Sequence, residues 1–429
     1  MALIGSIRRL FTRRVGTASV YLVATVLARA GGILLVPLYT RRLTTGEYGD
    51  YALAQTLVAL MSTPLALGLH AAVSRFYFEA KDLGQSIRKA GTAARWLILV
   101  TLGISSLLQM VVLLACPPGR HGIHGQWELS CILWAAAGSG IGVIPGQYLR
   151  GAQRPFAGAA FQLSEFIFSV GAGLLMVLVL NRGLRGAVEA AALQAVISGA
   201  ISIVFISVSL KGPLSRATLR EALKFSLPYV PHAMGNQIQF IADRWVMKFT
   251  GNDAGLGVYA LASQLTTPVS MATQAWHTAS SPEMGEVSRN EGPAGLAAHS
   301  YKYQRSYVLV TVAASVAVCV GMPIATLFVG KNFTQSLYLV PVICGIMVFE
   351  SLYFANDVFV FYLGQTAVIP KITITAGILN VVFNIIFIPV YGLWGAIISR
   401  TLSMAFRSGA MWYAARTYLR RGQAVPAAS

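Results

Sequence analysis

Long apolar runs, separated by glycine, proline and clusters of charge, follow one another along the whole chain. A membrane-spanning helix needs about 20 mostly apolar residues. Runs of that kind lie near residues 15–38, 51–72, 92–115, 129–149, 157–180, 187–209, 224–249, 255–279, 306–329, 336–362, 368–390 and 393–415. The longest segments between them, about 73–91 and 280–305, are predicted to be short connectors. The sequence therefore predicts an all-α polytopic membrane protein with about twelve transmembrane helices.

The composition supports the same class of protein. Charged residues make up 11% of the chain and apolar residues 55%, whereas about 25% charged residues is usual for a soluble domain. So few charges would not cover the surface of a soluble enzyme, and so much apolar content excludes a disordered chain. A polytopic membrane protein remains.

The distribution of lysine and arginine predicts the orientation, because these residues accumulate in cytoplasmic loops. With the N-terminus inside, 22 of the 33 lysines and arginines fall on the cytoplasmic side and 7 on the outer side. We therefore expect a multi-pass protein of the bacterial inner membrane with both termini in the cytoplasm. The net charge of +18 then follows from topology, and no nucleic-acid partner is needed to explain it.

The chain also repeats itself weakly. Residues 49–54 (GDYALA) match 257–262 (GVYALA) at an offset of 208, and 183–187 (GLRGA) match 392–396 (GLWGA) at an offset of 209. Two matches at nearly one offset predict two six-helix lobes of the same orientation, related by a pseudo-two-fold axis along the membrane normal. The predicted division is an N-lobe at 1–210, a cytoplasmic linker at 211–222 and a C-lobe at 223–429.

Polar and charged side chains occur inside several predicted spans at helical spacing. One face of the seventh span holds His232, Asn236, Gln239 and Asp243, and one face of the eighth holds Ser263, Thr267, Ser270, Gln274 and His277. Other ionisable residues inside spans are Arg29, Glu165, Arg244, Glu350, Asp357, Arg400 and Arg407. Such faces avoid lipid, so they line a wet cavity or pack on each other. For single Ser or Thr residues packing is the preferred interpretation, and Asp243 beside Arg244 is also typical of a buried ion pair that fixes helix packing.

Several motifs are missing from the sequence. The four cysteines, at 116, 131, 319 and 344, form no CxxC pair, and we favour unpaired thiols at Cys116 and Cys131. There is no GxxxxGK[ST] motif, and no long external loop carries paired carboxylates. We expect no metal, no cofactor and no enzymatic activity.

Several segments taken in order resemble a known family. They are 27–32 with 43–53, Arg75-Phe76-Tyr77, Tyr148-Leu149-Arg150-Gly151, 225–228, 242–245, 257–260, 379–384 and 388–396. Together they resemble the bacterial O-antigen and exopolysaccharide flippases of the multidrug/oligosaccharidyl-lipid/polysaccharide exporter superfamily. The resemblance covers essentially the whole chain. It implies a V-shaped exporter with a central cavity that moves undecaprenyl-pyrophosphate-linked sugar units from the cytoplasmic to the outer leaflet.

The resemblance, joined to the chemistry of the residues, suggests roles for individual side chains. Arginine suits a pyrophosphate because its planar fork is permanently charged. The predicted pyrophosphate-binding residues are Arg29, Arg244, Arg400, Arg407, Arg75, Arg150 and Arg154. The predicted sugar contacts are Asn236, Gln239, Gln274 and His277, and the candidates for coupling to H⁺ or Na⁺ are Asp243, Glu165, Glu350 and Asp357. The predicted partners are the lipid-linked oligosaccharide, membrane lipids, and a polysaccharide polymerase with glycosyltransferases.

Other functions stay open at this point. A cation-coupled multidrug exporter of the same superfamily is the main alternative, and it predicts that acidic residues dominate an apolar cavity. A peptidoglycan-precursor flippase usually carries further spans after the twelfth, and a non-transporting scaffold would not need polar stripes along its spans. The sequence does not predict the sugar, the coupling ion, the oligomeric state or the resting conformation.

Overall fold

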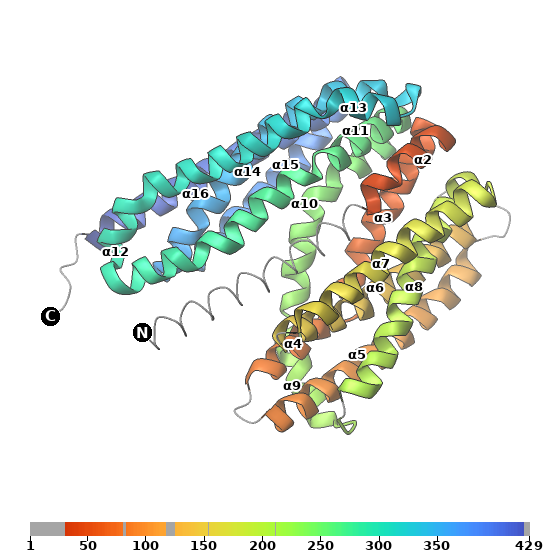
Figure 1. Cartoon of the computed structure of the whole chain (residues 1–429), viewed down its shortest axis with the longest axis horizontal. Helices are drawn as coiled ribbons and strands as arrows, with labels where there is room; N and C mark the ends of the chain where they lie inside the picture. Colours follow the sequence, from red (N-terminus) through yellow and green to blue (C-terminus); the bar gives the residue numbers. More distant parts are fainter. Residues whose placement is uncertain (1–30, 80–82, 117–124, 153, 211, 424–429) are drawn as a thin grey trace, which may run out of the picture. The chain divides into compact units, whose positions relative to one another are not determined.

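The computed structural model describes residues 31–79, 83–116, 125–152, 154–210 and 212–423, and in these ranges every regular element is helical (Figure 1). In chain order they are α2 (Val36–Arg42), α3 (Thr45–Leu65), α4 (Leu69–Glu79), α5 (Leu83–Ala115), α6 (Gln126–Gly151), α7 (Pro155–Gly173), the π-helix η1 (Leu174–Val179), α8 (Gly183–Ser209), α9 (Arg216–Ser226), α10 (Tyr229–Phe249), α11 (Asp253–Leu265), α12 (Thr267–Val320), α13 (Met322–Phe328), the 3₁₀ turn η2 (Lys331–Phe333), α14 (Thr334–Tyr362), α15 (Val368–Tyr391) and α16 (Leu393–Gln423). Seven of the described helices are long and apolar enough to cross a membrane, or eight with the bent pair α3–α4.

The chain forms two compact units. The N-terminal unit comprises residues 1–43 and 50–237, and the C-terminal unit comprises 44–49 and 238–429. Helix α10 therefore begins in the first unit and ends in the second, and the first turn of α3 belongs to the C-terminal unit. The lobe boundary at 211–222 stays a prediction.

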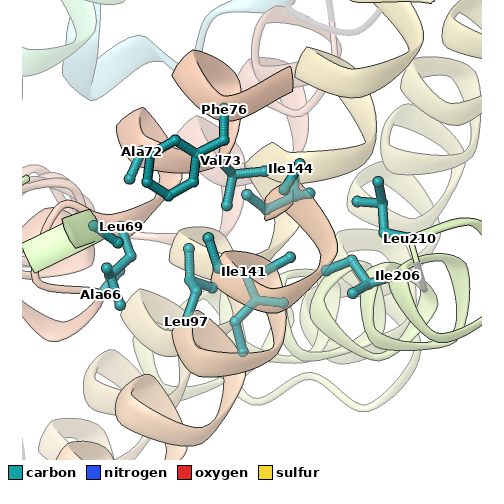
Figure 2. Packing of buried hydrophobic residues seen from close by; sticks show 14 residues of the cluster. Ala66, Leu69, Ala72, Val73, Phe76, Leu97, Ile141, Ile144, Ile206 and Leu210 are labelled. Carbon is teal, nitrogen blue, oxygen red and sulfur yellow. The ribbon is translucent and has the colours of Figure 1, made fainter. Parts of the chain in front are cut away.

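The core of the N-terminal unit lies where α4, α5, α6 and α8 meet (Figure 2). Its largest members are fully buried and come from different helices: Phe76 on α4, Leu97 on α5, Ile141 on α6 and Ile206 on α8. Six buried alanines also belong to this cluster: Ala66, Ala72, Ala90, Ala93, Ala94 and Ala222. In a membrane this arrangement is stabilised by close van der Waals packing, which small side chains permit, because lipid is as apolar as the core.

The second predicted span is a bent pair of helices. Helix α3 ends at Leu65 and α4 begins at Leu69, and the two are inclined by 60°. Pro64 removes a helical hydrogen bond, and Leu67 and Gly68 adopt positive φ values of 46° and 65°. These residues explain why the predicted span at 51–72 is interrupted at residues 66–68.

The seventh predicted span, 224–249, is also divided. Helix α9 ends at Ser226 and α10 begins at Tyr229, with Pro228 between them. The segment before α9 is fixed to α5, because Trp96 donates from Nε1 to the carbonyl oxygen of Ser215 at 3.1 Å. The helix at 216–226 is thus a separate element packed against α4 and α5.

The segment predicted to be a short connector, 280–305, holds the turn between two helices. Element α12 consists of two helices that meet at Gly292, whose φ of 64° is not helical. Hydrogen bonds between Thr273 and Thr311 at 2.9 Å and from Trp276 to Ser306 at 3.1 Å show that the second helix runs back beside the first. Met284 and Leu296 lie buried on either side of the turn, in a cluster with residues of α14 and α16. The segment is therefore helical on both sides of its turn and packed, rather than an open loop.

The internal repeat has a direct structural counterpart. Gly183, the first residue of α8, and Gly392, just before α16, have φ values of 56° and 55°, which favour glycine. In the C-terminal unit the first turn of α3 packs on α11 at the repeated glycines: a Cβ at Gly257 would lie 1.8 Å from the Thr45 carbonyl oxygen. The repeat therefore preserves backbone contacts that side chains would block.

Candidate functional site

A polar cavity of about 220 Å³ lies within the C-terminal unit. We call it the C-terminal cavity. Its lining comes from α10, α11, α12, α14 and α16: Asp243, Arg244, Tyr259, Ser263, Thr267, Ser270, Gln274, Met347, Glu350 and Arg400. Two predicted pyrophosphate-binding residues, one predicted sugar contact and two predicted coupling residues thus line the same space.

Tyr259 connects an acid and a base at the wall of this cavity. Its hydroxyl donates to Asp243 Oδ2 at 2.5 Å and accepts from the Arg400 guanidinium at 3.2 Å. The other carboxylate oxygen of Asp243 accepts from the backbone N–H of Arg244 at 2.8 Å. Asp243 and Tyr259 are both almost fully buried, so the negative charge of Asp243 is held by donors from the protein itself.

The arginines of the cavity keep unused donors. The buried Nε atoms of Arg244 and Arg400 have no hydrogen-bond partner within the described residues, and neither does the hydroxyl of Ser263. A buried donor without an acceptor costs about 1–3 kcal/mol, and more when it is charged. Glu350 lies close enough to Arg400 and Arg407 to interact with both charges. The cavity lining is therefore balanced in formal charge, and two of its guanidinium N–H donors have no partner within the described residues.

Arg407 and Asp357 lie outside the lining of the cavity. The Arg407 guanidinium stacks over the Tyr353 ring at 3.8 Å from its centre, a cation–π contact. Arg407 Nε is buried without a hydrogen-bond partner in the described part of the chain, and so is one carboxylate oxygen of Asp357. The Tyr353 hydroxyl in turn lies 3.3 Å from Thr373 Oγ1. The predicted roles of Arg407 in binding and of Asp357 in coupling stay predictions.

His277 takes part in a network of hydroxyl groups. Its Nδ1 lies 3.0 Å from the hydroxyl of Tyr307, and Tyr307 lies 3.0 Å from Tyr303 and 3.3 Å from Ser280. Ser280, Tyr303 and Tyr307 are buried. Of the two predicted sugar contacts on α12, only Gln274 lines the C-terminal cavity.

The remaining predicted residues are placed as follows. In the N-terminal unit, Glu165 accepts from Ser198 Oγ at 2.8 Å, the Arg75 guanidinium stacks on Phe225 at 4.6 Å, and Arg154 is exposed just before α7. Arg29 lies outside the described residues, and so do the side chains of Arg150, Asn236 and Gln239.

Sequence reasoning missed Tyr259 as a site residue. It entered the sequence analysis only as a position of the internal repeat and of the family resemblance, 16 residues after Asp243. The signal was its equivalence to Tyr51 at the offset of 208, combined with an intramembrane carboxylate on the preceding helix. Within the described ranges, no three His, Cys, Asp or Glu side chains are grouped so as to hold a metal ion, and all four cysteines are free.

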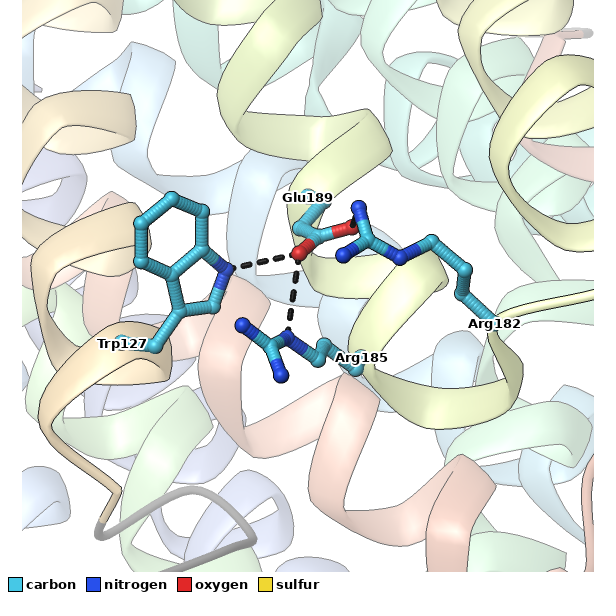
Figure 3. Close-up of polar contacts among 4 residues, drawn as sticks. All are labelled: Trp127, Arg182, Arg185 and Glu189. Carbon is cyan, nitrogen blue, oxygen red and sulfur yellow. Dashed lines mark hydrogen bonds and ion pairs between the residues drawn. The ribbon is translucent and has the colours of Figure 1, made fainter. Parts of the chain in front are cut away.

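A second charged cluster lies in the N-terminal unit at the start of α8 (Figure 3). Glu189 is 6% exposed and accepts from Trp127 Nε1 at 2.7 Å, Arg182 at 2.6 Å and Arg185 at 3.2 Å. The Arg185 guanidinium also stacks on Trp127. Because this carboxylate is saturated by donors, the cluster fixes the α6–α8 contact.

Comparison with known proteins places this arrangement among transporters. The model of a family described as "Polysaccharide biosynthesis protein" matches residues 15–288. The chain is 23% identical over 390 residues to a Haloferax volcanii protein named "Probable low-salt glycan biosynthesis flippase Agl15", covering 89% of this chain and 79% of that one. It is also 23% identical to a protein of the Lsg locus of Haemophilus influenzae, covering 88% and 94%.

Solved structures of low sequence identity share the fold. The lipid II flippase MurJ in an inward closed conformation matches at a TM-score of 0.74 and 14% identity, over 92% of this chain and 87% of that one. An inward-facing multidrug resistance MATE transporter of the MOP superfamily matches at 0.72 and 14%, over 96% and 100%. The prediction of an all-α, two-lobed membrane transporter fold is confirmed.

Proposed function

Because the chain belongs to the polysaccharide biosynthesis protein family, we propose that it moves a polyprenyl-pyrophosphate-linked oligosaccharide across the membrane. Undecaprenyl pyrophosphate is the carrier that this proposal assigns to a bacterial inner membrane, and movement runs from the cytoplasmic to the outer leaflet. The observation that carries the proposal is the pair of buried arginines, Arg244 and Arg400, whose Nε donors are unpaired in the C-terminal cavity.

An anionic headgroup fits this cavity in charge and in size. Arginine donates to phosphate oxygens in a fixed fork, and such charge-assisted bonds are strong away from water. A volume of about 220 Å³ holds roughly fifteen to twenty water-sized groups, at about 10–15 Å³ for each. A diphosphate with part of a sugar fits within that space, and Gln274 and Ser270 on α12 offer neutral hydrogen bonds to it.

Coupling to an ion is assigned to the carboxylates near these arginines. Asp243 is bonded to Tyr259, which is bonded to Arg400. Protonation of Asp243 would remove an acceptor from Tyr259 and alter the field at Arg400, so substrate and H⁺ would influence each other through one hydroxyl. Glu350 lies beside the same arginine. Glu165, in the N-terminal unit, and Asp357, outside the cavity lining, are further candidates for the same role. The cycle alternates between inward-open and outward-open states.

A cation-coupled multidrug exporter is the second candidate function. It is favoured by the two acidic residues of the cavity, Asp243 and Glu350, and by a fold shared with a multidrug transporter. The geometry gives it less support, because Asp243 is already held by Tyr259 and by a backbone N–H. A carboxylate that is occupied in this way attracts an organic cation weakly.

The test is a flipping assay in proteoliposomes. A labelled polyprenyl-pyrophosphate sugar is followed into the opposite leaflet with and without an H⁺ or Na⁺ gradient, for wild-type protein, Arg400→Gln and the matched exposed control Arg305→Gln. We expect protein-dependent flipping that falls about tenfold to a hundredfold in Arg400→Gln, as for loss of a charged hydrogen bond, and is unchanged in Arg305→Gln.

The other results decide against the flippase. If the wild-type protein leaves the lipid in place but takes up an organic cation, the multidrug exporter is the correct function. If flipping is equal in all three proteins, Arg400 does not bind the headgroup. In a separate comparison, the dependence of flipping on an ion gradient is measured in Asp243→Asn and in Glu350→Gln. The variant that loses this dependence identifies the coupling residue.

A further inference from the structure

The N-terminal unit contains a smaller polar cavity of about 70 Å³, which we call the N-terminal cavity. It is lined by Leu35, Tyr39, Tyr51, Gln55, Val58, Ala135, Ser139, Ser169, Ala190, Ala191, Gln194 and Ala195. Six of these twelve residues carry hydroxyl or amide groups, and none carries a charge. None of them is among the residues to which the sequence assigned a role.

The internal repeat relates this cavity to the C-terminal one. Applying the offsets of 208 and 209 to the two sets of lining residues relates six residues of the N-terminal cavity to seven of the C-terminal cavity. They are Leu35 with Asp243 and Arg244, Tyr51 with Tyr259, Gln55 with Ser263, Val58 with Thr267, Ser139 with Met347, and Ala191 with Arg400. The two cavities therefore occupy the same place in the two copies of the repeat, each within its own unit.

At these paired positions the N-terminal cavity has no charged residue, but it has polar side chains at Tyr51, Gln55 and Ser139. The acid on one side of the tyrosine is replaced by Leu35, and the arginine on the other side by Ala191. Tyr51 accepts instead from Gln55 Nε2 at 2.7 Å, and its ring packs edge-on against Tyr39 at 5.1 Å between centres. The lining of the N-terminal cavity thus offers only neutral hydrogen-bond donors and acceptors.

The chemistry of this lining selects one class of ligand. Without an arginine or lysine it offers nothing specific to a phosphate, and without a carboxylate it has no charge to repay the dehydration of a cation. Hydroxyl groups and side-chain amides both donate and accept hydrogen bonds, which matches the hydroxyl groups of a neutral sugar. At about 10–15 Å³ for each water-sized group, about 70 Å³ takes roughly five, or one edge of a sugar ring.

We propose that the N-terminal cavity is a binding site for the hydroxyl groups of a neutral sugar unit, with Gln194, Gln55 and Ser169 as its hydrogen-bonding side chains. This inference rests on the proposed function, since the sugar belongs to the lipid-linked substrate. In this proposal the C-terminal cavity binds the anionic part of the substrate, and the N-terminal cavity binds a sugar unit.

The test compares binding of two lipids by purified full-length protein in detergent. One is polyprenyl pyrophosphate carrying a neutral sugar, and the other is bare polyprenyl pyrophosphate. The variants are Gln194→Leu, which keeps side-chain bulk, Gln194→Leu with Ser169→Ala, and the exposed control Gln365→Leu. Among the described residues, neither Gln194 nor Ser169 makes an internal hydrogen bond that these changes would break, and thermal unfolding is measured for each protein.

We expect the wild-type protein to bind the sugar-bearing lipid more tightly than the bare lipid. Gln194→Leu should weaken only the sugar-bearing lipid, about three- to tenfold, as for one lost hydrogen bond, and the double variant should weaken it further. Binding of bare lipid and the behaviour of Gln365→Leu should not change.

The outcomes separate this inference from the proposed function. Equal loss for both lipids, or no loss for either, overturns the sugar site even where the wild-type protein flips the substrate. Sugar-selective binding that Gln194→Leu abolishes, in a protein that flips neither lipid in proteoliposomes, overturns the flippase and leaves the sugar site in place. A preference of the wild-type protein for the bare lipid overturns the sugar site directly.

Discussion

At the scale of the residue, one hydroxyl group decides how the charges of the C-terminal cavity are held. Tyr259 stands between Asp243 and Arg400 and satisfies both at once. A buried acid and base that are joined through a neutral hydroxyl group interact less strongly than the two charges of a direct ion pair. Either charge can then respond to a ligand or a proton without the loss of a complete salt bridge.

The Tyr259→Phe variant removes this hydroxyl and leaves the ring. Asp243 loses a donor and Arg400 an acceptor, so we expect a loss of stability of about 1–3 kcal/mol for groups left unsatisfied, measured as a lower midpoint of thermal unfolding in detergent. Flipping should fall as well, because the guanidinium is no longer positioned. Tyr338→Phe, at a 74% exposed position on α14, is the matched control. Unfolding midpoints that coincide in wild type and Tyr259→Phe would show that the bridge does not stabilise the fold.

At the scale of the element, helix contacts at glycine set how closely α3 and α11 approach. Gly49 and Gly257 occupy the same place in the two copies of the repeat, and they face each other in the C-terminal unit. Glycine lets two helix backbones come into contact, which is the main source of helix association in lipid. The repeated glycines therefore act as a paired contact.

The Gly257→Ala variant tests this contact. Its new Cβ would lie 1.8 Å from the Thr45 carbonyl oxygen, so the helices must separate. We expect a loss of roughly 1–3 kcal/mol or more, as for overpacking, seen as a lowered yield of folded protein and a lower unfolding midpoint. Gly345→Ala on α14, where a Cβ meets nothing within 4 Å, should be neutral or slightly stabilising. Equal unfolding midpoints for Gly257→Ala and Gly345→Ala would contradict the close approach of α3 and α11.

The charged cluster of α8 also acts at this scale, by joining α8 to α6. Glu189→Gln removes the charge from a carboxylate that is 6% exposed, while Arg182 and Arg185 keep theirs. We expect a destabilisation of about 1–2 kcal/mol, since the arginines are partly solvated. Glu221→Gln, whose pair with Lys89 is exposed on both sides, should change stability by less than about 0.5 kcal/mol. Urea or thermal unfolding of both variants measures the two losses of stability. Equal losses would show that the burial of Glu189 does not strengthen its ion pairs.

The elements also show how far sequence patterns predict this structure. Apolar runs located α5, α6, α8 and the helices from α14 to α16 closely, because each run is bounded by glycine, proline or charge. Pro64 predicts that a kink is permitted in the second span, but the patterns did not predict the break at residues 66–68 or the helices on both sides of Gly292, since these depend on packing partners that are distant in sequence. The cavity residues of α12 followed from helical spacing, whereas Tyr259 needed the fold to bring α11 beside α10 and α16.

At the scale of the whole molecule, the orientation in the membrane sets the direction of transport. The excess of lysine and arginine in one set of loops predicts that both termini and the turn near Gly292 are cytoplasmic. The same count places Lys331, before α14, on the outer side. A flippase that loads its substrate from the cytoplasmic leaflet needs this orientation, because the arginines predicted to bind the pyrophosphate at that face, Arg75 and Arg154, must face the site of synthesis.

Cysteine labelling measures this orientation. In a variant lacking the four native cysteines, Lys331→Cys should react with a membrane-impermeant maleimide in intact spheroplasts, because residue 331 is exposed and predicted to be outside. Asn290→Cys, also exposed, should react only after the membrane is permeabilised. Both variants need to retain flipping, so that the labelled protein is the active one. The reverse pattern would place the recruitment arginines outside, and it would make the transporter an importer of its lipid-linked substrate or the carrier of a different cargo.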